Sequence, residues 1–161
     1  MLLWVAMVGI LGLDQGPRVN MPDSRAQSGI TSAVLGAQAR LARPECQKVF
    51  TDFQDVEDRP LLERLEASLN APADYLAQQV WFVDGGDTPQ CRRDGTMAAF
   101  TVPGHHVIRV CGTRFAQRFE RERVAAEIIV IHEMLHTLGL GENPPSSRDI
   151  TAQVMRRCGG S

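Results

Sequence analysis

The sequence predicts an α+β fold, namely a single small domain in which a short mixed or antiparallel sheet lies beside a buried helix. A chain of 161 residues, 43% of them hydrophobic, is long enough for one compact core and too short for two comfortable ones. Two short β-prone runs on either side of Pro103-Gly104 predict a hairpin. A strongly apolar helical pattern follows this hairpin, so we expect the sheet and a buried helix to share the core.

The N-terminal end has the character of an export signal. Leu2 to Leu13 form an uncharged apolar run that is too short to cross a bilayer but matches the hydrophobic region of a signal peptide. We therefore expect residues 1–13 to be signal-like and the protein to be secreted or periplasmic, without a stable membrane span; a buried N-terminal helix or strand is the alternative. Residues 14–43 are rich in small and polar residues without a sustained period, which predicts a linker or leader before a folded domain over residues 44–161.

Hydrophobic spacing predicts the elements in the first half of that domain. Cys46 to Phe53 follow the i, i+3, i+4, i+7 pattern of a helix. Leu61 to Leu69 repeat this pattern and should end near Asn70-Ala71-Pro72. Val80 to Val83 is a β-prone run, and Cys91 to Gly95 is predicted to be a polar loop.

The second half contains the hairpin and the central helix. Met97 to Val102 and Val107 to Cys111 are the two predicted hairpin strands. From Phe115 to Leu138 apolar residues cover several faces of one helix, which should therefore be buried, with its polar residues satisfied by one another or by an ion. A last helical stripe, Ile150 to Cys158, includes Met155 and is expected to pack on the core.

The four cysteines predict two disulfides. They are widely spaced and form no CxxC pair, which favours disulfide partners in an oxidising compartment over a metal knuckle. Of the three possible connectivities we favour the one that would tie elements brought together by the fold: Cys91 with Cys111, and Cys46 with Cys158. A structural zinc held by Cys91, Cys111 and the His105-His106 pair is the competing interpretation.

The central helix carries an HExxH motif, His132-Glu133-Met134-Leu135-His136. The two histidines lie one turn apart, about 40° from each other around the helix axis, so both imidazoles can reach one tetrahedral zinc. Glu133 is rotated by about 100° from His132, which places it beside the metal, where a general base must stand. Two core histidines bonded to backbone carbonyls are the alternative, but this would leave the carboxylate buried without a metal.

A catalytic zinc usually has a third protein ligand, and we expect it to be Glu142. Gly139 can adopt the left-handed conformation that ends a helix, and a turn there would bring Glu142 back toward the metal. Asp149 is the rival ligand. The run Ser146 to Asp149 also has the pattern of a capping box, which already accounts for Asp149.

The stretch from His132 to Glu142 resembles the metzincin pattern HExxHxxGxxH, with Glu142 standing where that family of zinc metallopeptidases has a third histidine. The resemblance extends over Val124 to Met155. It implies a small zincin-like domain, a zinc cofactor and a peptide or protein substrate, with the strand Val107 to Cys111 forming the edge of the cleft. The family's methionine turn and its tyrosine lack clear counterparts here, since the sole tyrosine, Tyr75, lies far upstream.

We expect a hydrolase in which zinc is held by His132, His136 and Glu142 while Glu133 accepts a proton from the attacking water. The candidates for stabilising the oxyanion are Arg148, His105 and His106.

Two other functions stay open: an exported, disulfide-tied binding module with a structural or inactive zinc site, and a metal-dependent amidase acting on non-protein amides. A net charge of -2 with scattered charges makes nucleic acid an unsuitable partner. The sequence predicts no particular oligomeric state.

Overall fold

The computed structural model describes residues 16–160, so the predicted signal segment lies outside the described residues. The strands are β1 (Arg18–Asn20), β2 (Trp81–Asp84), β3 (Ala99–Thr101) and β4 (Val107–Val110). The helices are α1 (Ser24–Leu41), α2 (Pro44–Gln47), α3 (Val49–Asp52), α4 (Leu61–Ala67), α5 (Pro72–Gln78), α6 (Pro89–Arg93), α7 (Gly112–Arg121), α8 (Arg123–Thr137) and α9 (Ser147–Cys158). The predicted α+β class is confirmed.

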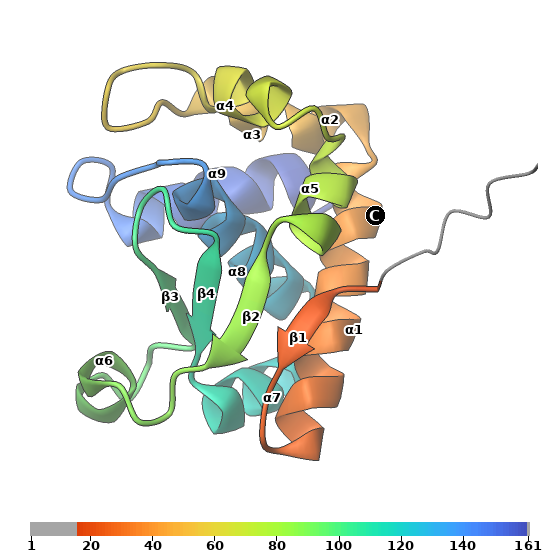
Figure 1. Ribbon diagram of the computed structural model, residues 1–161, viewed down its shortest axis with the longest axis vertical. Coiled ribbons are helices and arrows are strands. Elements are labelled where there is room, and N and C mark those ends of the chain that lie inside the picture. The colour runs from red at the N-terminus through yellow and green to blue at the C-terminus, as the bar shows by residue number, and fades with distance from the viewer. Residues whose placement is uncertain (1–15, 161) are drawn as a thin grey trace, which may run out of the picture.

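The strands form one mixed sheet in the order β1-β2-β4-β3 (Figure 1). β1, β2 and β4 run parallel, and β3 pairs antiparallel with β4, which confirms the predicted hairpin. β3 therefore lies at an edge of the sheet and β4 lies in its interior. The expectation that the strand beginning at Val107 forms the cleft edge is wrong, because β2 and β3 already pair with its two sides.

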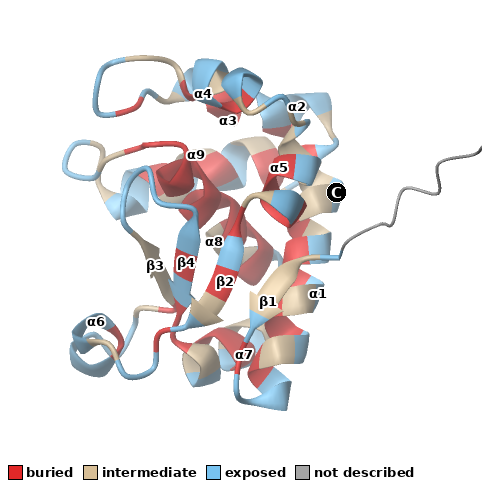
Figure 2. Cartoon of the chain, in the orientation of Figure 1, coloured by how far each residue is buried: buried red, intermediate tan, exposed pale blue. Residues whose placement is uncertain are grey.

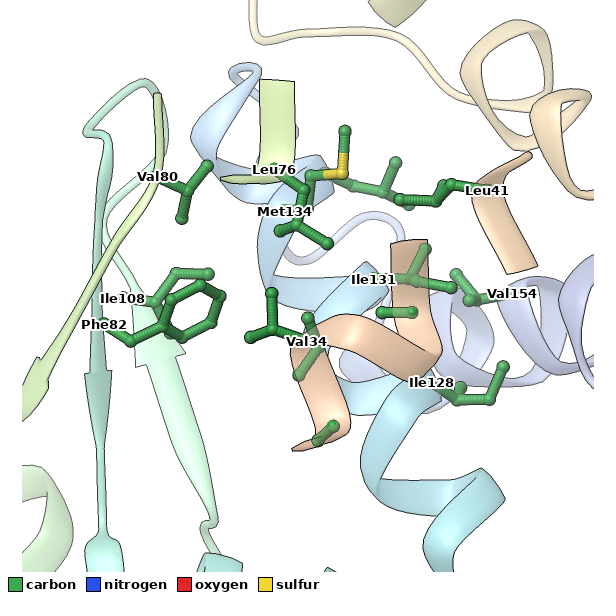
Figure 3. Close-up of a cluster of buried hydrophobic side chains, with 14 of the residues drawn as sticks. Val34, Leu41, Leu76, Val80, Phe82, Ile108, Ile128, Ile131, Met134 and Val154 are labelled. Atoms are coloured by element: carbon green, nitrogen blue, oxygen red, sulfur yellow. The ribbon is translucent and has the colours of Figure 1, made fainter. Parts of the chain in front are cut away.

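One face of the sheet packs on helices and the other faces solvent. Phe82 and Ile108 are buried, whereas their chain neighbours Trp81 and Val107 are exposed, as the two-residue period of a strand requires (Figure 2). The buried side chains meet Val34 of α1 and the apolar residues of α8, including Met134 (Figure 3). The core therefore lies between the sheet and these two helices.

The expected linker over residues 14–43 is wrong for its described part, which forms β1 and the 18-residue helix α1. Asp23 caps α1 by accepting a hydrogen bond from the Ala26 backbone N–H at 2.8 Å. The buried face consists largely of small residues: Ala26, Gly29, Ile30, Ala33, Val34, Ala37 and Leu41. Alanine is a strong helix former, and small side chains let α1 pack closely on α7 and α8, so a composition typical of linkers encodes a core helix.

Three further boundaries differ from the prediction. The helix expected from Phe115 to Leu138 is divided into α7 and α8 at Glu122, whose φ is -143° and ψ is 73°. The helix expected from Cys46 to Phe53 is likewise divided into α2 and α3. Hydrophobic spacing is unbroken through the second break, and the four charged residues Glu120 to Arg123 mark the first only as an exposed stretch, so periodicity alone does not locate the breaks. The predicted loop from Cys91 to Gly95 contains most of α6, which Thr88 caps and Pro89 opens.

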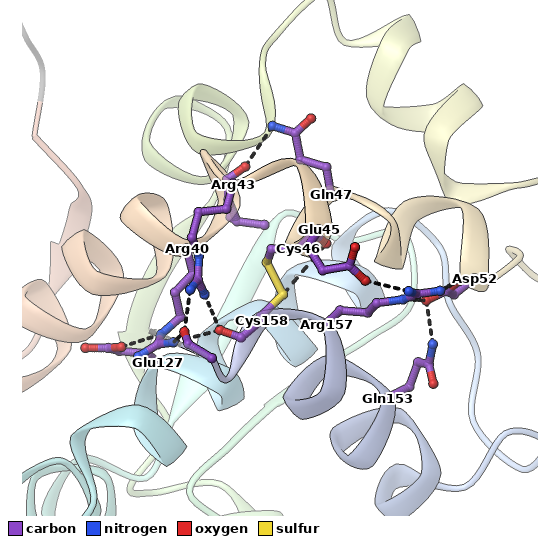
Figure 4. Close-up of a disulfide and its surroundings, with 12 residues drawn as sticks. Arg40, Arg43, Glu45, Cys46, Gln47, Asp52, Glu127, Gln153, Arg157 and Cys158 are labelled. Carbon is purple, nitrogen blue, oxygen red and sulfur yellow. Dashed lines mark hydrogen bonds and ion pairs between the residues drawn. A yellow bond between two sulfur atoms is a disulfide. The ribbon is translucent and has the colours of Figure 1, made fainter.

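Both predicted disulfides are present, so the competing zinc site at Cys91 and Cys111 is wrong. Cys46–Cys158 joins α2 to the end of α9 across 112 residues of sequence (Figure 4). Arg157 of α9 reinforces this junction through ion pairs with Glu45 at 2.6 Å and Asp52 at 2.7 Å. α9 is thus held firmly at its C-terminal end. Met155 on the same helix is 39% exposed, so the prediction that it packs on the core is wrong.

In the described part of the chain, no helix combines the length and the hydropathy needed to cross a bilayer.

Gly36→Ala should lower the free energy of unfolding by about 1–3 kcal/mol, because a Cβ at Gly36 would lie 2.3 Å from Oε1 of Glu127. Glu127 is buried and held by Arg40 at 2.6 Å, so it cannot move aside freely. In a solvent-exposed helix the same change would stabilise by about 1 kcal/mol. Urea unfolding measures whether the free energy of unfolding falls or rises. Gly95→Ala, which meets open space, is the control, and an unchanged or higher stability of Gly36→Ala would contradict the observed packing of α1.

Candidate metal centre

The polar residues of the HExxH motif lie on the buried α8. His132, Glu133 and His136 are 4%, 6% and 3% exposed, yet all three line a cavity of about 540 Å³. The other walls come from β3, from the segment between α6 and β3, and from the start of α9. The motif therefore stands at the floor of a cavity within an otherwise apolar core.

The chain reverses immediately after α8 and brings Glu142 back to the histidines. Gly139 has a φ of +104°, and its N–H bonds the carbonyl of His136 while the N–H of Leu140 bonds that of Leu135. These two bonds define a Schellman motif with Gly139 as its left-handed residue, as the sequence predicts. Glu142 then lies with Oε1 3.2 Å from Nε2 of His136.

The three predicted ligands form a cluster that can hold a metal ion. The Nε2 atoms of His132 and His136 are 3.0 Å apart, and Oε1 of Glu142 lies 3.7 Å and 3.2 Å from them. Ligands of a tetrahedral ion with bonds of about 2.0–2.1 Å are about 3.3 Å apart. The three donor atoms therefore have the spacing that one tetrahedral ion requires.

Two further contacts orient the imidazoles. Nδ1 of His136 lies 2.7 Å from the carbonyl oxygen of Leu140, and Nδ1 of His132 lies 2.9 Å from Oγ1 of Thr151 on α9. A carbonyl oxygen only accepts, so Nδ1 of His136 carries a proton, and in the neutral ring Nε2 is the nitrogen that keeps a lone pair. Partners of this kind fix the tautomer and direction of metal-binding histidines. Sequence reasoning missed both, because neither residue type signals such a role.

The protonation states suit metal binding and proton transfer. Burial, together with the nearby His136, lowers the pKa of His132 to about 3, so this imidazole is neutral at physiological pH. Burial raises the pKa of Glu133 to about 7, although His136 and a hydrogen bond from Thr101 act in the opposite direction. Oγ1 of Thr101 donates that bond to Oε2 of Glu133 at 2.8 Å. Glu133 can therefore both accept and release a proton near neutral pH.

The other candidate residues lie away from the cluster. Asp149 accepts a hydrogen bond from the Ser146 hydroxyl at 2.6 Å at the start of α9, which is a capping contact. His106 packs edge-on against Tyr75, and His105 lines a separate small cavity beside the hairpin. Arg148 is exposed in the first turn of α9. None of the three proposed oxyanion stabilisers lines the 540 Å³ cavity.

The loop before α4 supports the turn that carries Glu142. The N–H of Val56 bonds the carbonyl of Gly139 at 3.2 Å, and the side chain of Asp55 is fully buried beneath it. Asp55 accepts backbone bonds from Glu57 and Arg59 and side-chain bonds from Arg59 and Arg64. Burial alone would raise the pKa of Asp55, but these bonds outweigh it and lower the pKa to about 2.

The chain matches no protein-family model, and no curated protein or solved structure is significantly similar to it.

Thr151→Val should weaken divalent-metal binding by about 10-fold to 100-fold, because the ring of His132 loses the partner that orients it. Thr151→Ser keeps the hydroxyl and should bind metal nearly as tightly as the wild type. Competition against a chromophoric chelator, with Co²⁺ and Zn²⁺, measures both affinities. Equal affinities for the valine and serine variants would contradict an orienting role of Thr151.

Asp55→Asn should destabilise the protein most above pH 4, and the difference from wild type should shrink as the pH falls toward 2. The pKa of Asp55 is about 2 in the folded protein, against an ordinary value of 3.8 for an unfolded chain. Its ionised form therefore favours folding above both values, and the benefit is lost as the acid is protonated. Urea unfolding of both proteins across pH 2–7 gives this difference. A difference that does not depend on pH would show that the Asp55 charge is irrelevant.

Proposed function

We propose that this protein is a zinc-dependent hydrolase and, more specifically, a peptidase. The observation that carries the proposal is the position of Glu133, which lines the cavity beside the three-residue cluster without belonging to it. A structural metal site has no use for a fourth, separately held acid. A catalytic site needs one as a general base.

Zinc suits the donor set of two imidazoles and one carboxylate, and three protein ligands leave a tetrahedral position open, as in catalytic rather than structural sites. When bound, zinc supplies a Lewis acid that acidifies water and polarises a carbonyl group.

The chain itself supplies the proton transfer. Thr101 holds Oε2 of Glu133, and Oε1 is left to take a proton from the attacking water. A pKa of about 7 lets the same carboxyl group return that proton to the leaving amine. Thr151 and the carbonyl of Leu140 hold the rings of His132 and His136, so that their Nε2 atoms stay directed at the proposed metal position.

A peptide is favoured over a small amide because an edge strand borders the cavity. Ala99, Phe100 and Thr101 of β3 line it, and within the described sheet β3 has a neighbour, β4, on one side only. An extended peptide can add to such an edge through main-chain hydrogen bonds. Its scissile bond would then run past Glu133, to which Thr101 is bonded.

We further propose an extracytoplasmic location, secreted or periplasmic. Two disulfides cross-link this small domain, and such bonds persist in oxidising compartments. The apolar run from Leu2 to Leu13 has the composition of an export signal.

Glu133→Gln should abolish peptide hydrolysis, with a loss of at least about 10²-fold, while the protein keeps its zinc. Glutamine fills the same volume but cannot accept the proton. Metal content by mass spectrometry and cleavage of an unstructured peptide library are the two measurements. Glu66→Gln, at an exposed position on α4, is the matched control and should leave both unchanged.

Unchanged hydrolysis by the Glu133→Gln protein would refute this mechanism. A wild-type protein that binds zinc but cleaves no peptide would instead support the binding module or the amidase.

A further inference from the structure

We infer that the cavity holds, beside Asp94, a subsite for a basic side chain of the substrate, lysine or arginine. This inference rests on the proposed peptidase function and adds a substrate class to it. The charged side chains that line the cavity are the carboxylates Asp94, Glu133 and Glu142, in addition to the two histidines. The chain has 17 Lys and Arg residues, yet none in its described part lines this cavity.

The sign of these charges determines which side chains the cavity accepts. A zinc ion held by His132, His136 and Glu142 would be offset by the carboxylates next to it, and Asp94 is the carboxylate of the lining that lies outside this group. A cleft lined by charge of one sign concentrates its field and attracts the opposite sign. An acidic substrate side chain would meet like charge, whereas a basic one would pair with Asp94.

The cavity has a floor long enough for an aliphatic stem. Its floor on α8 extends from His136 back to Ile129, which at 1.5 Å per residue is about 10 Å. Met97 and Ala98 form part of the opposite wall next to Asp94. Lysine and arginine bury their methylene groups against apolar surface of this kind while the charged end stays polar. An extended peptide covers about 10 Å with three residues, so we expect the subsite within about three residues of the scissile bond.

Asp94 is held in place before any substrate arrives. Its Oδ1 accepts hydrogen bonds from the Thr96 hydroxyl at 2.7 Å, the Thr96 N–H at 2.8 Å and the Met97 N–H at 3.2 Å. These bonds, the Thr96 hydroxyl first, hold the pKa of Asp94 below its usual value, so the group is ionised at neutral pH. Oδ2 makes no hydrogen bond to any described residue and is left to receive a cation.

The backbone around Asp94 is fixed as well. The disulfide Cys91–Cys111 ties α6 to the start of α7. Arg114 of α7 donates to the carbonyl oxygens of Cys91, Asp94 and Met97. Arg114 itself lines the neighbouring cavity, and its positive charge is close enough to favour the ionised form of the Asp94 carboxyl. A preformed carboxylate loses little entropy when it binds its partner.

The test compares peptides that carry lysine, norleucine or glutamate at each of the three positions on either side of the scissile bond. At one of these positions the zinc-loaded wild type should cleave the lysine peptide about fivefold to tenfold better than the norleucine peptide, and the glutamate peptide worst. Fluorescence anisotropy of the same peptides on the Glu133→Gln protein gives a readout that does not depend on turnover.

Asp94→Asn is the decisive variant because its amide oxygen can still accept the bonds now made to Oδ1, while the charge is gone. It should lose the lysine preference in both assays and keep the norleucine values. Asp87→Asn, a highly exposed acid just before α6 that does not line the cavity, is the matched control and should behave as wild type. In the wild type, the lysine preference should also weaken as salt is raised.

The subsite is refuted by equal treatment of the lysine and norleucine peptides, by a lysine preference that survives in Asp94→Asn, or by a preference that salt does not change. Absence of all cleavage would count against the proposed peptidase function. The binding measurements would then decide on the subsite independently.

Discussion

The structure depends on one constraint: α8 is buried on nearly every side, yet it carries two imidazoles and a carboxylate. A polar group withdrawn from water must find a partner, because an unpaired one costs several kcal/mol. Each of the three has found one: Thr151 on α9 bonds His132, the carbonyl of Leu140 bonds His136, and Thr101 on β3 bonds Glu133. The second nitrogens of the imidazoles, the two Nε2 atoms, face each other and Glu142.

Much of the remaining fold holds those partners in position. α9 delivers Thr151 and is anchored by the Cys46–Cys158 disulfide and by the ion pairs of Arg157. The loop around Asp55 supports the Gly139 turn that returns Glu142. α1 packs along α8 through a face of small residues, with the Arg40–Glu127 pair closing one side of the contact (Figure 4). Stability and geometry of the site are therefore supplied by the same contacts.

The chemistry proposed for the site follows from differences in environment between neighbouring residues of one helix. His132 and Glu133 are adjacent, yet burial drives their pKa values in opposite directions, so that the first is a neutral ligand and the second a proton carrier. Because β3 is an edge strand, the cavity is open to an extended chain along one wall. In the proposed function, its acidic lining selects among such chains by charge.

The sequence by itself determined what depends on neighbouring residues: the one-turn spacing of His132 and His136, the helix end at Gly139, the β3–β4 hairpin and the return of Glu142 to the two histidines. These are set by helical period, left-handed glycine and capping, which act within a few residues. Only the tertiary structure decided that Thr151 and Thr101 support the site, that β3 and not β4 is the sheet edge, that residues 24–41 are a core helix, and that Asp94 lines the cavity. Such contacts join residues distant in sequence, and they arise from packing, which leaves no periodic mark on the chain.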